Sequence, residues 1–251
     1  MLLKDKNNRT GGLVNTFERD GFYFDAGPRA FVNSGMVKPI LKDLGIEWET
    51  LDNKISIAIE DQMFQVNSMD SLNEYKNILD KLYPHNKQEI EKIIKYISKL
   101  SKYTKTLYAF DNPYFVDYMS DKKFVFTKLL PWTVKLIYAL TKFNQYSMPM
   151  EEFLEVQTNN SSLRDILTQF FFSKTPTYFA LGYFHVWMDY FYPKGGTGVL
   201  PKLLHNKILE NNGTIKLNTQ IKEIIPSELK IVDKEGNSYK YDYLIWASDL
   251  K

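Results

Sequence analysis

The stretch Leu2-Leu3-Lys4-Asp5-Lys6-Asn7-Asn8-Arg9-Thr10-Gly11-Gly12 decides the fold. Its apolar start predicts a short strand that ends at an acid, Asp5, and paired glycines follow six and seven residues later. In dinucleotide-binding βαβ units, an acid at the end of the second strand accepts hydrogen bonds from ribose hydroxyls. Glycines let the backbone approach a ligand closely because they carry no Cβ. An acid near Gly-Gly is common in turns, so the residues that follow decide the interpretation.

The run from Gly11 to Pro28 reads Gly-Gly-Leu-Val-Asn-Thr-Phe-Glu-Arg-Asp-Gly-Phe-Tyr-Phe-Asp-Ala-Gly-Pro. It resembles the second half of the FAD-binding signature of phytoene desaturases, carotenoid isomerases, protoporphyrinogen oxidases and monoamine-oxidase-like flavoproteins. That signature has an acid, a basic residue, Arg-x-Gly-Gly and a hairpin ending in Phe-Asp-x-Gly. The resemblance implies that Asp5 holds the ribose. It places six further residues at the cofactor: Lys6, Arg9, Gly11, Gly12, Gly27 and Pro28.

Two later motifs extend the resemblance in the family's order. Tyr192-Pro-Lys-Gly-Gly196 is similar to the family's Tyr-Pro-x-Gly-Gly element, after which the backbone at Ile221 would pair with the adenine edge. Tyr241-Asp-Tyr-Leu-Ile-Trp-Ala-Ser-Asp249 is similar to a family strand whose end lies close to FAD. The resemblance therefore adds Ala247 and Ser248 to the cofactor-binding residues.

The implied fold class is α/β: part of a glutathione-reductase-type FAD-binding domain, split by a substrate domain with a helical cap. Residues 1–66 would form an FAD-domain part that runs into substrate-domain strands. Residues 67–190 carry helical periodicity and would form the substrate and cap region. Residues 191–251 would return to the FAD-binding domain. The order α/β, helical, α/β favours one split domain with an insertion over two tandem domains.

Local patterns predict individual elements. Arg19-Asp20 predicts a hairpin turn, Ser34 an N-cap, and Ser71 with Glu74 a capping box. Helices are predicted from Asn86 onward and around Phe124–Phe143, Met150–Glu155, Ser162–Phe172, Tyr178–Tyr190 and Gly198–Glu210. Strands are predicted at Leu2–Lys4, Ile55–Val66, Thr214–Leu217, Leu229–Asp233 and Ser238–Ala247.

Composition excludes several classes of function. The net charge is +2 with both signs interspersed, and nucleic-acid-binding motifs are absent, so no nucleic-acid partner is expected. The chain has no Cys, which excludes disulfides and thiolate chemistry. His185 and Asp189 lie four residues apart, but two candidate ligands do not make a metal site, so none is predicted. The 17 Phe, 17 Tyr and 4 Trp fit either a large core shaped by coding bias or an aromatic-lined tunnel for an apolar ligand.

The most apolar long segment, Phe124–Phe143, contains Lys128, Lys135 and Lys142. Three lysines argue against a bilayer-spanning helix. A buried helix with snorkelling lysines is the preferred interpretation, and an interfacial amphipathic helix is the alternative. A cytoplasmic location is expected, with peripheral membrane contact as part of the alternative.

The expected function is that of a fragment of an FAD-dependent oxidoreductase, which moves hydride from an apolar, polyisoprenoid-like substrate to flavin. No catalytic residue is assigned, because the flavin takes the hydride. Only four residues precede Asp5, so the family's Gly-x-Gly-x-x-Gly element, which holds the pyrophosphate, is not expected here. Weak FAD binding by this chain is expected for that reason. The rival interpretation is an inactive remnant, or one half of a split flavoprotein that binds FAD only with the other portion.

Overall fold

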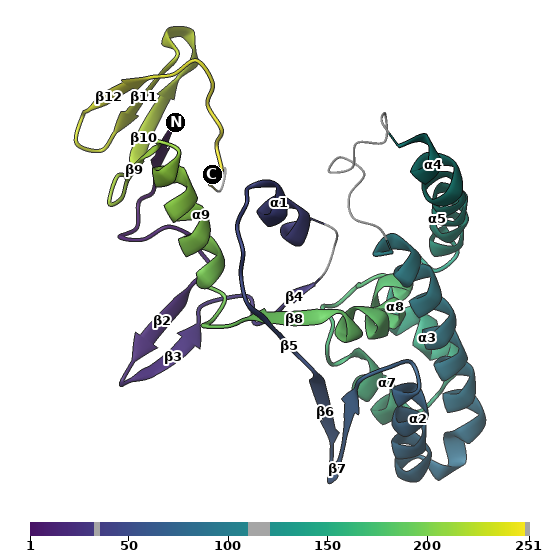
Figure 1. The fold of residues 1–251 in the computed structure, drawn as a ribbon. Coiled ribbons are helices and arrows are strands. Elements are labelled where there is room, and N and C mark those ends of the chain that lie inside the picture. The colour runs from purple at the N-terminus through teal and green to yellow at the C-terminus, as the bar shows by residue number, and fades with distance from the viewer. Residues whose placement is uncertain (33–35, 110–120, 249–251) are drawn as a thin grey trace. The chain divides into compact units, whose positions relative to one another are not determined.

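A computed structural model describes residues 1–32, 36–109 and 121–248 (Figure 1). The chain divides into two compact units. One is discontinuous and combines Met1–Arg29 with Pro193–Lys251, and the other is Ala30–Tyr192. They are called the discontinuous unit and the helical unit below. The N-cap predicted at Ser34 lies outside the described residues.

In the discontinuous unit, β1 (Leu2–Lys4) pairs in parallel with β9 (Thr214–Lys216), with Leu3 opposite Ile215. Figure 1 shows the two strands side by side. β9 follows α9 (Val199–Glu210), whose C-cap residue is Asn211. Leu2–Lys4, Thr214–Leu217 and Ile245–Ala247 were expected to be neighbours. The first two are paired, although more than 200 residues apart, whereas Ile245–Ala247 joins no sheet of the described residues.

Two antiparallel elements complete this unit. β2 (Thr16–Arg19) and β3 (Phe22–Asp25) form the predicted hairpin around Asp20 and Gly21. β10 (Ile221–Ile225), the short 3₁₀ turn Pro226–Glu228, β11 (Lys230–Asp233) and β12 (Ser238–Lys240) form a three-stranded meander.

The strand predicted for Ser238–Ala247 is too long, because β12 ends at Lys240. Tyr241 donates its backbone N–H to Leu229, and beyond it no strand of the described chain pairs with the segment. A strand needs a hydrogen-bonded neighbour. Without one, Tyr243 and Ile245 are about 90% exposed.

The helical unit begins with two small sheets. The first is a three-stranded sheet with the order β4 (Phe31–Val32), β8 (Tyr190–Pro193), β5 (Thr50–Asp52). Along the chain, α1 (Val37–Asp43) lies between β4 and β5. This sheet escaped prediction because its strands are only two to four residues long and far apart in sequence.

A hairpin replaces the single strand predicted for Ile55–Val66. β6 (Ile55–Ile59) and β7 (Gln62–Val66) pair antiparallel around Glu60 and Asp61. Glu60 and Asp61 interrupt the apolar run and form the turn. The hairpin then buries alternate side chains of both strands on one face: Ile57, Ile59, Phe64 and Val66.

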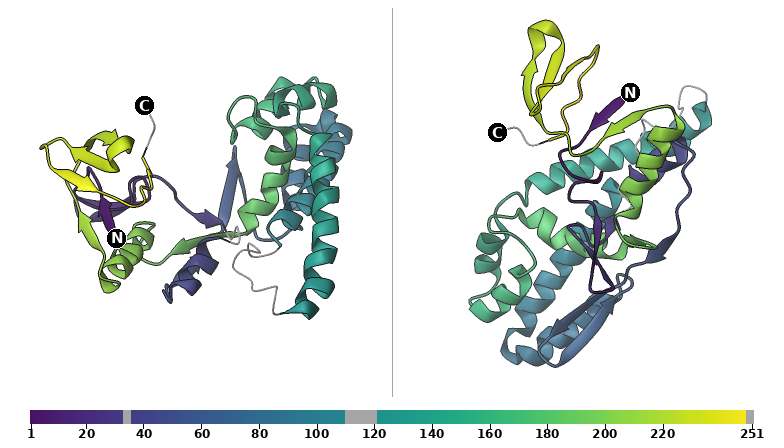
Figure 2. Two further views of the ribbon diagram at one scale, coloured as in Figure 1. Left: turned by 90° about the horizontal axis from the view of Figure 1, so that it is seen from above. Right: turned by 90° about the vertical axis from the view of Figure 1, so that its left-hand side faces the viewer.

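The helices pack around α3 (Lys87–Leu107) in the blue to green part of the chain (Figure 2). The apolar residues that recur at helical spacing along α3 are all buried: Ile90, Ile93, Ile94, Ile97 and Leu100. α8 (Thr177–Met188) lies against α3, and Gly182 permits that approach because a Cβ there would meet the Thr104 hydroxyl. The remaining helices are α2 (Ser71–Leu82), the 3₁₀ turn Pro84–Asn86, α4 (Lys122–Phe124), the π-turn Val125–Leu129, α5 (Leu130–Asn144), α6 (Met150–Gln157) and α7 (Ser161–Thr168).

Three details of this unit differ from prediction. Ser71 forms no capping box, because its hydroxyl instead accepts the N–H groups of Asn67 and Ser68 ahead of the helix. The predicted buried helix around Phe124–Phe143 is exposed over most of its surface. The aromatic-rich core borders a partly open pocket of about 30 Å³, lined by residues that include Phe171 and Phe184, which is too small for an extended apolar ligand.

Candidate nucleotide-binding site

Asp5 directly follows the last residue of β1. Its N–H donates to the Lys216 carbonyl (3.0 Å), and its own carbonyl accepts from the N–H of Thr219 (2.8 Å). These bonds continue the parallel ladder past the end of β1. They place Asp5 beside the segment that enters β10 at Ile221.

The Asp5 carboxylate forms a local turn and keeps one oxygen free. Its Oδ1 accepts from the backbone N–H of Asn7 (2.9 Å) and from the Asn7 side-chain amide (3.0 Å). Within the described residues Oδ2 accepts no hydrogen bond, and the side chain is half-buried. An ionised carboxylate with a free oxygen at a strand end can accept a hydrogen bond from a hydroxyl group.

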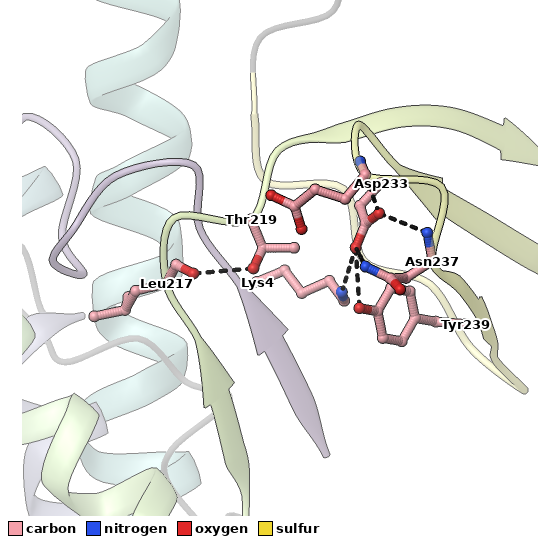
Figure 3. A network of polar contacts seen from close by, with 7 residues as sticks. Lys4, Leu217, Thr219, Asp233, Asn237 and Tyr239 are labelled. Atoms are coloured by element: carbon pink, nitrogen blue, oxygen red, sulfur yellow. Dashed lines mark hydrogen bonds and ion pairs between the residues drawn. The ribbon is translucent and has the colours of Figure 1, made fainter.

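Lys4 points to the opposite side of β1, because side chains alternate along a strand. Figure 3 shows its ammonium group directed at Asp233 and Tyr239. The Nζ atom lies 4.0 Å from Asp233 Oδ2 and 2.9 Å from the centre of the Tyr239 ring. This contact connects β1 to the β10–β12 meander. It thereby helps to fix the direction in which the next residue, Asp5, leaves the strand.

Burial and hydrogen bonding set the charge states of this pair. Burial is the main cause that lowers the pKa of Lys4. Burial alone would raise the pKa of Asp233, but hydrogen bonds from Asn237 and Tyr239 and the charge of Lys4 outweigh it and hold that pKa below its usual value. Asp233 is therefore an ionised carboxylate in the fold, and it also accepts the N–H of Glu235 (3.1 Å).

The two glycines after Asp5 have different surroundings. Gly11 has φ +109°, and a Cβ there would lie 2.6 Å from the Val14 carbonyl and 2.7 Å from Pro201 of α9. Gly12 has φ +55°, and nothing lies within 4 Å of its Cβ position. Gly11 therefore serves packing against α9, while Gly12 presents bare backbone to open space where a ligand can approach.

The second motif meets the first through a network centred on Asp25. Asp25 Oδ1 accepts hydrogen bonds from the Thr16 hydroxyl (2.9 Å), the Thr197 N–H (2.9 Å) and the Thr197 hydroxyl (3.0 Å). Thr16 Oγ1 in turn accepts the N–H of Gly198, the N-cap residue of α9 (2.9 Å). Thr197 is fully buried. The network joins the β2–β3 hairpin to the start of α9.

Close backbone approach explains the glycines of this network. A Cβ at Gly196 would lie 2.4 Å from the Thr16 hydroxyl, and one at Gly198 would lie 2.7 Å from the Thr16 N–H nitrogen. A Cβ at Gly27 would lie 2.6 Å from the Leu13 carbonyl. Gly27 therefore holds the end of the hairpin against the residue that follows Gly12.

The other predicted residues lie at the margin of this region or outside it. Arg9 is exposed and donates from Nη1 to the Thr16 carbonyl (3.3 Å), while Lys6 is exposed and Pro28 half-buried. Ala247 and Ser248 are exposed, and no strand of the described residues brings them to the site. The cofactor-binding roles of all these residues stay predictions.

Sequence reasoning missed the polar groups that assemble the region. Thr16 and Thr197 were not selected, although both flank selected glycine motifs. His205 was not selected either; it is half-buried, and its Nδ1 lies 3.2 Å from the Thr10 hydroxyl oxygen. A threonine next to a motif carries little sequence signal, because its partner lies far along the chain.

No cluster of metal-ligating residues occurs in the part of the chain that the structure describes. His185 Nε2 and Asp189 Oδ2, in the helical unit, lie 3.8 Å apart. Burial is the main cause that lowers the pKa of His185. The pair is a half-buried contact within one stretch of chain, and it gives no indication of a metal centre.

Comparison with solved structures shows the same fold. An oxidoreductase from Methanosarcina mazei is 13% identical with a TM-score of 0.61, and the PF1083 protein from Pyrococcus furiosus is 14% identical with a TM-score of 0.57. Both alignments cover 96% of this chain and 51% of the other. A putrescine oxidase redesigned in its cofactor binding is 11% identical with a TM-score of 0.54, over 94% of this chain and 49% of that one.

The chain thus spans about half the length of the solved structures it matches. No curated protein matches the sequence. The family of flavin containing amine oxidoreductases matches residues 2–251, which is nearly the whole chain. By that match the chain belongs to the flavin containing amine oxidoreductase family.

Proposed function

We propose that the discontinuous unit holds the adenosine side of FAD in an FAD-dependent oxidoreductase. The observation that carries the proposal is the position of Asp5: its free Oδ2 stands at the end of a parallel strand, and the open backbone of Gly12 follows seven residues later. In dinucleotide-binding folds an acid at this position bonds the ribose hydroxyls.

The residues present fit that part of the cofactor. Asp5 would accept a ribose hydroxyl, and the backbone at Ile221, in the segment that Asp5 contacts, would face the adenine. Arg9 and Lys6 would contribute positive charge near the phosphates, where paired charges strengthen hydrogen bonds. The Asp25 network would keep the hairpin and α9 in register around Gly12.

When bound, FAD would accept a hydride from the substrate. The residues described above bind and orient the cofactor, and none of them touches a reacting atom, so no catalytic residue is assigned. An apolar substrate is the class that the resemblance implies. The pocket in the helical unit has an apolar and aromatic lining but measures only about 30 Å³, so this substrate class rests on the resemblance alone.

A second candidate function is one half of a split flavoprotein. Among the described residues, β1 and β9 form a sheet of only two strands. Parallel sheets are normally larger and covered on both faces. The exposed apolar segment at Tyr243 and Ile245 lacks a partner strand in the same part of the chain. A second polypeptide that supplies strands would complete this sheet and the cofactor site together.

The two candidates differ in a direct binding experiment. The purified chain is titrated with FAD and, separately, with FMN, which lacks the adenosine that Asp5 would hold, while flavin fluorescence is followed. The proposal predicts a preference for FAD of at least about tenfold, or 1.4 kcal/mol. Equal affinity for the two flavins contradicts it. No binding of either flavin by the chain alone, restored on addition of a second polypeptide, favours the split flavoprotein.

A further inference from the structure

The continuous helical stretch Lys122–Asn144 has an inner face and an outer face of different character. On the inner face Ala139 and Phe143 are buried, and Trp132 donates from Nε1 to the Thr106 carbonyl (2.8 Å). These contacts attach the stretch to α3. Among the described residues it is the one helix whose length and composition would suffice to cross a membrane, yet only 6% of its apolar stretch is buried.

Large apolar side chains occupy the outer face. Phe126 and Val134 are each 69% exposed, and Leu130, Ile137 and Tyr138 are about half exposed. From Leu130 onward they recur at the helical spacing of three and four residues, so they form one stripe on α5. A contiguous exposed apolar stripe of this kind marks a site of interaction with a protein or a membrane.

The charge of the stretch decides between those partners. It contains five lysines and no acidic residue: Lys122, Lys123, Lys128, Lys135 and Lys142. Lys128, Lys135 and Lys142 are spaced by seven residues, so they follow one line along the helix. On α5, Lys135 and Lys142 lie about a quarter turn from the centre of the apolar stripe. The Lys142 Nζ atom lies 5.4 Å from the ring centre of Tyr138, an aromatic residue with an apolar ring and a polar tip.

An apolar stripe bordered by a cationic line matches the boundary between acyl chains and anionic headgroups. Aliphatic side chains enter the acyl region, lysines reach up to the phosphates, and tyrosine suits the headgroup level. A protein partner would require complementary acidic groups and gives no reason for a purely cationic border. A spanning helix would place Lys128 and Lys135 within the hydrocarbon, at high cost.

We propose that the Lys122–Asn144 helix is a membrane-docking surface, which lies in the interface of an anionic bilayer with its Phe126–Ile137 stripe in the acyl boundary. This inference does not depend on the flavin site, and its test uses no activity. Binding would be reversible and sensitive to salt, because part of it is electrostatic.

The test is sedimentation of the full chain with vesicles of phosphatidylcholine alone or with about one-third phosphatidylglycerol. Substitution V134E together with I137E should weaken binding to anionic vesicles by more than tenfold. The matched control is M63E with V156E, which places the same two charges at exposed apolar positions elsewhere. Circular dichroism and thermal unfolding establish that all variants are folded.

A second pair of variants tests the cationic line. K128Q with K135Q should weaken binding to anionic vesicles about fivefold for each lysine. K87Q with K92Q, on exposed positions of α3, removes the same charge and should have little effect. Three results would each overturn the proposal. The first is equal binding to neutral and anionic vesicles, and the second is binding that V134E with I137E does not weaken. The third is that the chain forms concentration-dependent dimers without lipid and that V134E abolishes them.

Discussion

Asp25 accepts the backbone N–H of Thr197 at 2.9 Å across 172 residues of sequence, and this bond joins the hairpin after the glycine pair to the N-terminus of α9. The Thr197 hydroxyl donates to the same carboxylate oxygen at 3.0 Å. Asp25 belongs to the first motif and Thr197 directly follows the second, and the helical unit separates the two motifs in sequence. The discontinuous unit is therefore assembled by a buried, charge-assisted contact as well as by strand pairing.

Removal of the Thr197 hydroxyl should weaken this unit selectively. Thr197→Val keeps the side-chain shape and deletes one hydrogen bond to a carboxylate in a fully buried position. The expected loss is about 1.5–3 kcal/mol of the free energy of unfolding. Thr214→Val, at an exposed position of β9, is the control. Hydrogen exchange should show lost protection in residues 14–28 and 193–200 and unchanged protection in α3. Uniform loss in both units would contradict this account.

Gly11 and Gly12 should respond differently to substitution. Gly11→Ala drives a Cβ against Val14 and Pro201 at a strained backbone angle, so a loss of at least about 2 kcal/mol is expected. Gly12→Asn places a side chain in open space, and Asn tolerates the left-handed region, so its stability cost should be below about 1 kcal/mol.

For FAD affinity we expect the reverse order. Gly12→Asn should weaken binding about tenfold, because its side chain occupies the space that the ligand approaches. Thermal unfolding and flavin fluorescence of the two variants measure stability and affinity separately. A Gly12→Asn variant with unchanged FAD affinity would show that the cofactor does not approach this backbone.

Asp233 should make the discontinuous unit sensitive to acid. Its pKa is depressed in the fold by hydrogen bonds and by Lys4, which outweigh the opposing effect of burial. Its contribution to stability is therefore complete above the usual carboxyl pKa of about 3.9 and is lost as the pH falls through the lower folded pKa.

The variant Asp233→Asn removes this part of the pH dependence and should lower the unfolding midpoint at pH 7. Lys4→Met should lower it less, because burial disfavours the charged lysine whereas Asp233 keeps its hydrogen bonds from Asn237 and Tyr239. Denaturation at pH 7 and below pH 4 measures both effects. A Lys4→Met variant less stable than Asp233→Asn would be the opposite of this expectation.

The sequence predicted the elements that carry strong local signals. The apolar residues that repeat at helical spacing from Ile90 to Leu100 are buried on α3. The hairpin expected at Arg19-Asp20 forms with its turn one residue later, at Asp20-Gly21. That Leu2–Lys4 and Thr214–Leu217 are neighbours was expected from family order and not from local pattern, and the register of Leu3 with Ile215 was not predicted. Long helices and tight turns are set by nearby residues, which is why they could be predicted.

What could not be predicted depends on distant partners. The Ser71 hydroxyl accepts the N–H of Asn67, in the turn before the helix, and not an N–H group of the first helical turn. Residues after Lys240 remain unpaired, because a strand forms only beside another strand. The exposed stripe at Val134 and Ile137 has an apolar composition that is equally typical of a buried helix. In the site, Asp5 and the glycines could be selected because they match a sequence motif. Thr16 and Thr197 could not, because only their hydrogen bonds to Asp25 connect them to the site.

The central claim is that the Asp5 carboxylate holds the adenosine ribose of FAD, and the most direct measurement is the FAD affinity of Asp5→Asn beside that of Asp20→Asn. Asp20 lies exposed in the hairpin turn at φ +54°, a conformation that Asn adopts readily, so this control removes the same charge. Loss of a hydrogen bond to a charged group should weaken FAD binding by Asp5→Asn about ten- to a hundredfold. Equal FAD affinity of Asp5→Asn and Asp20→Asn would contradict the account.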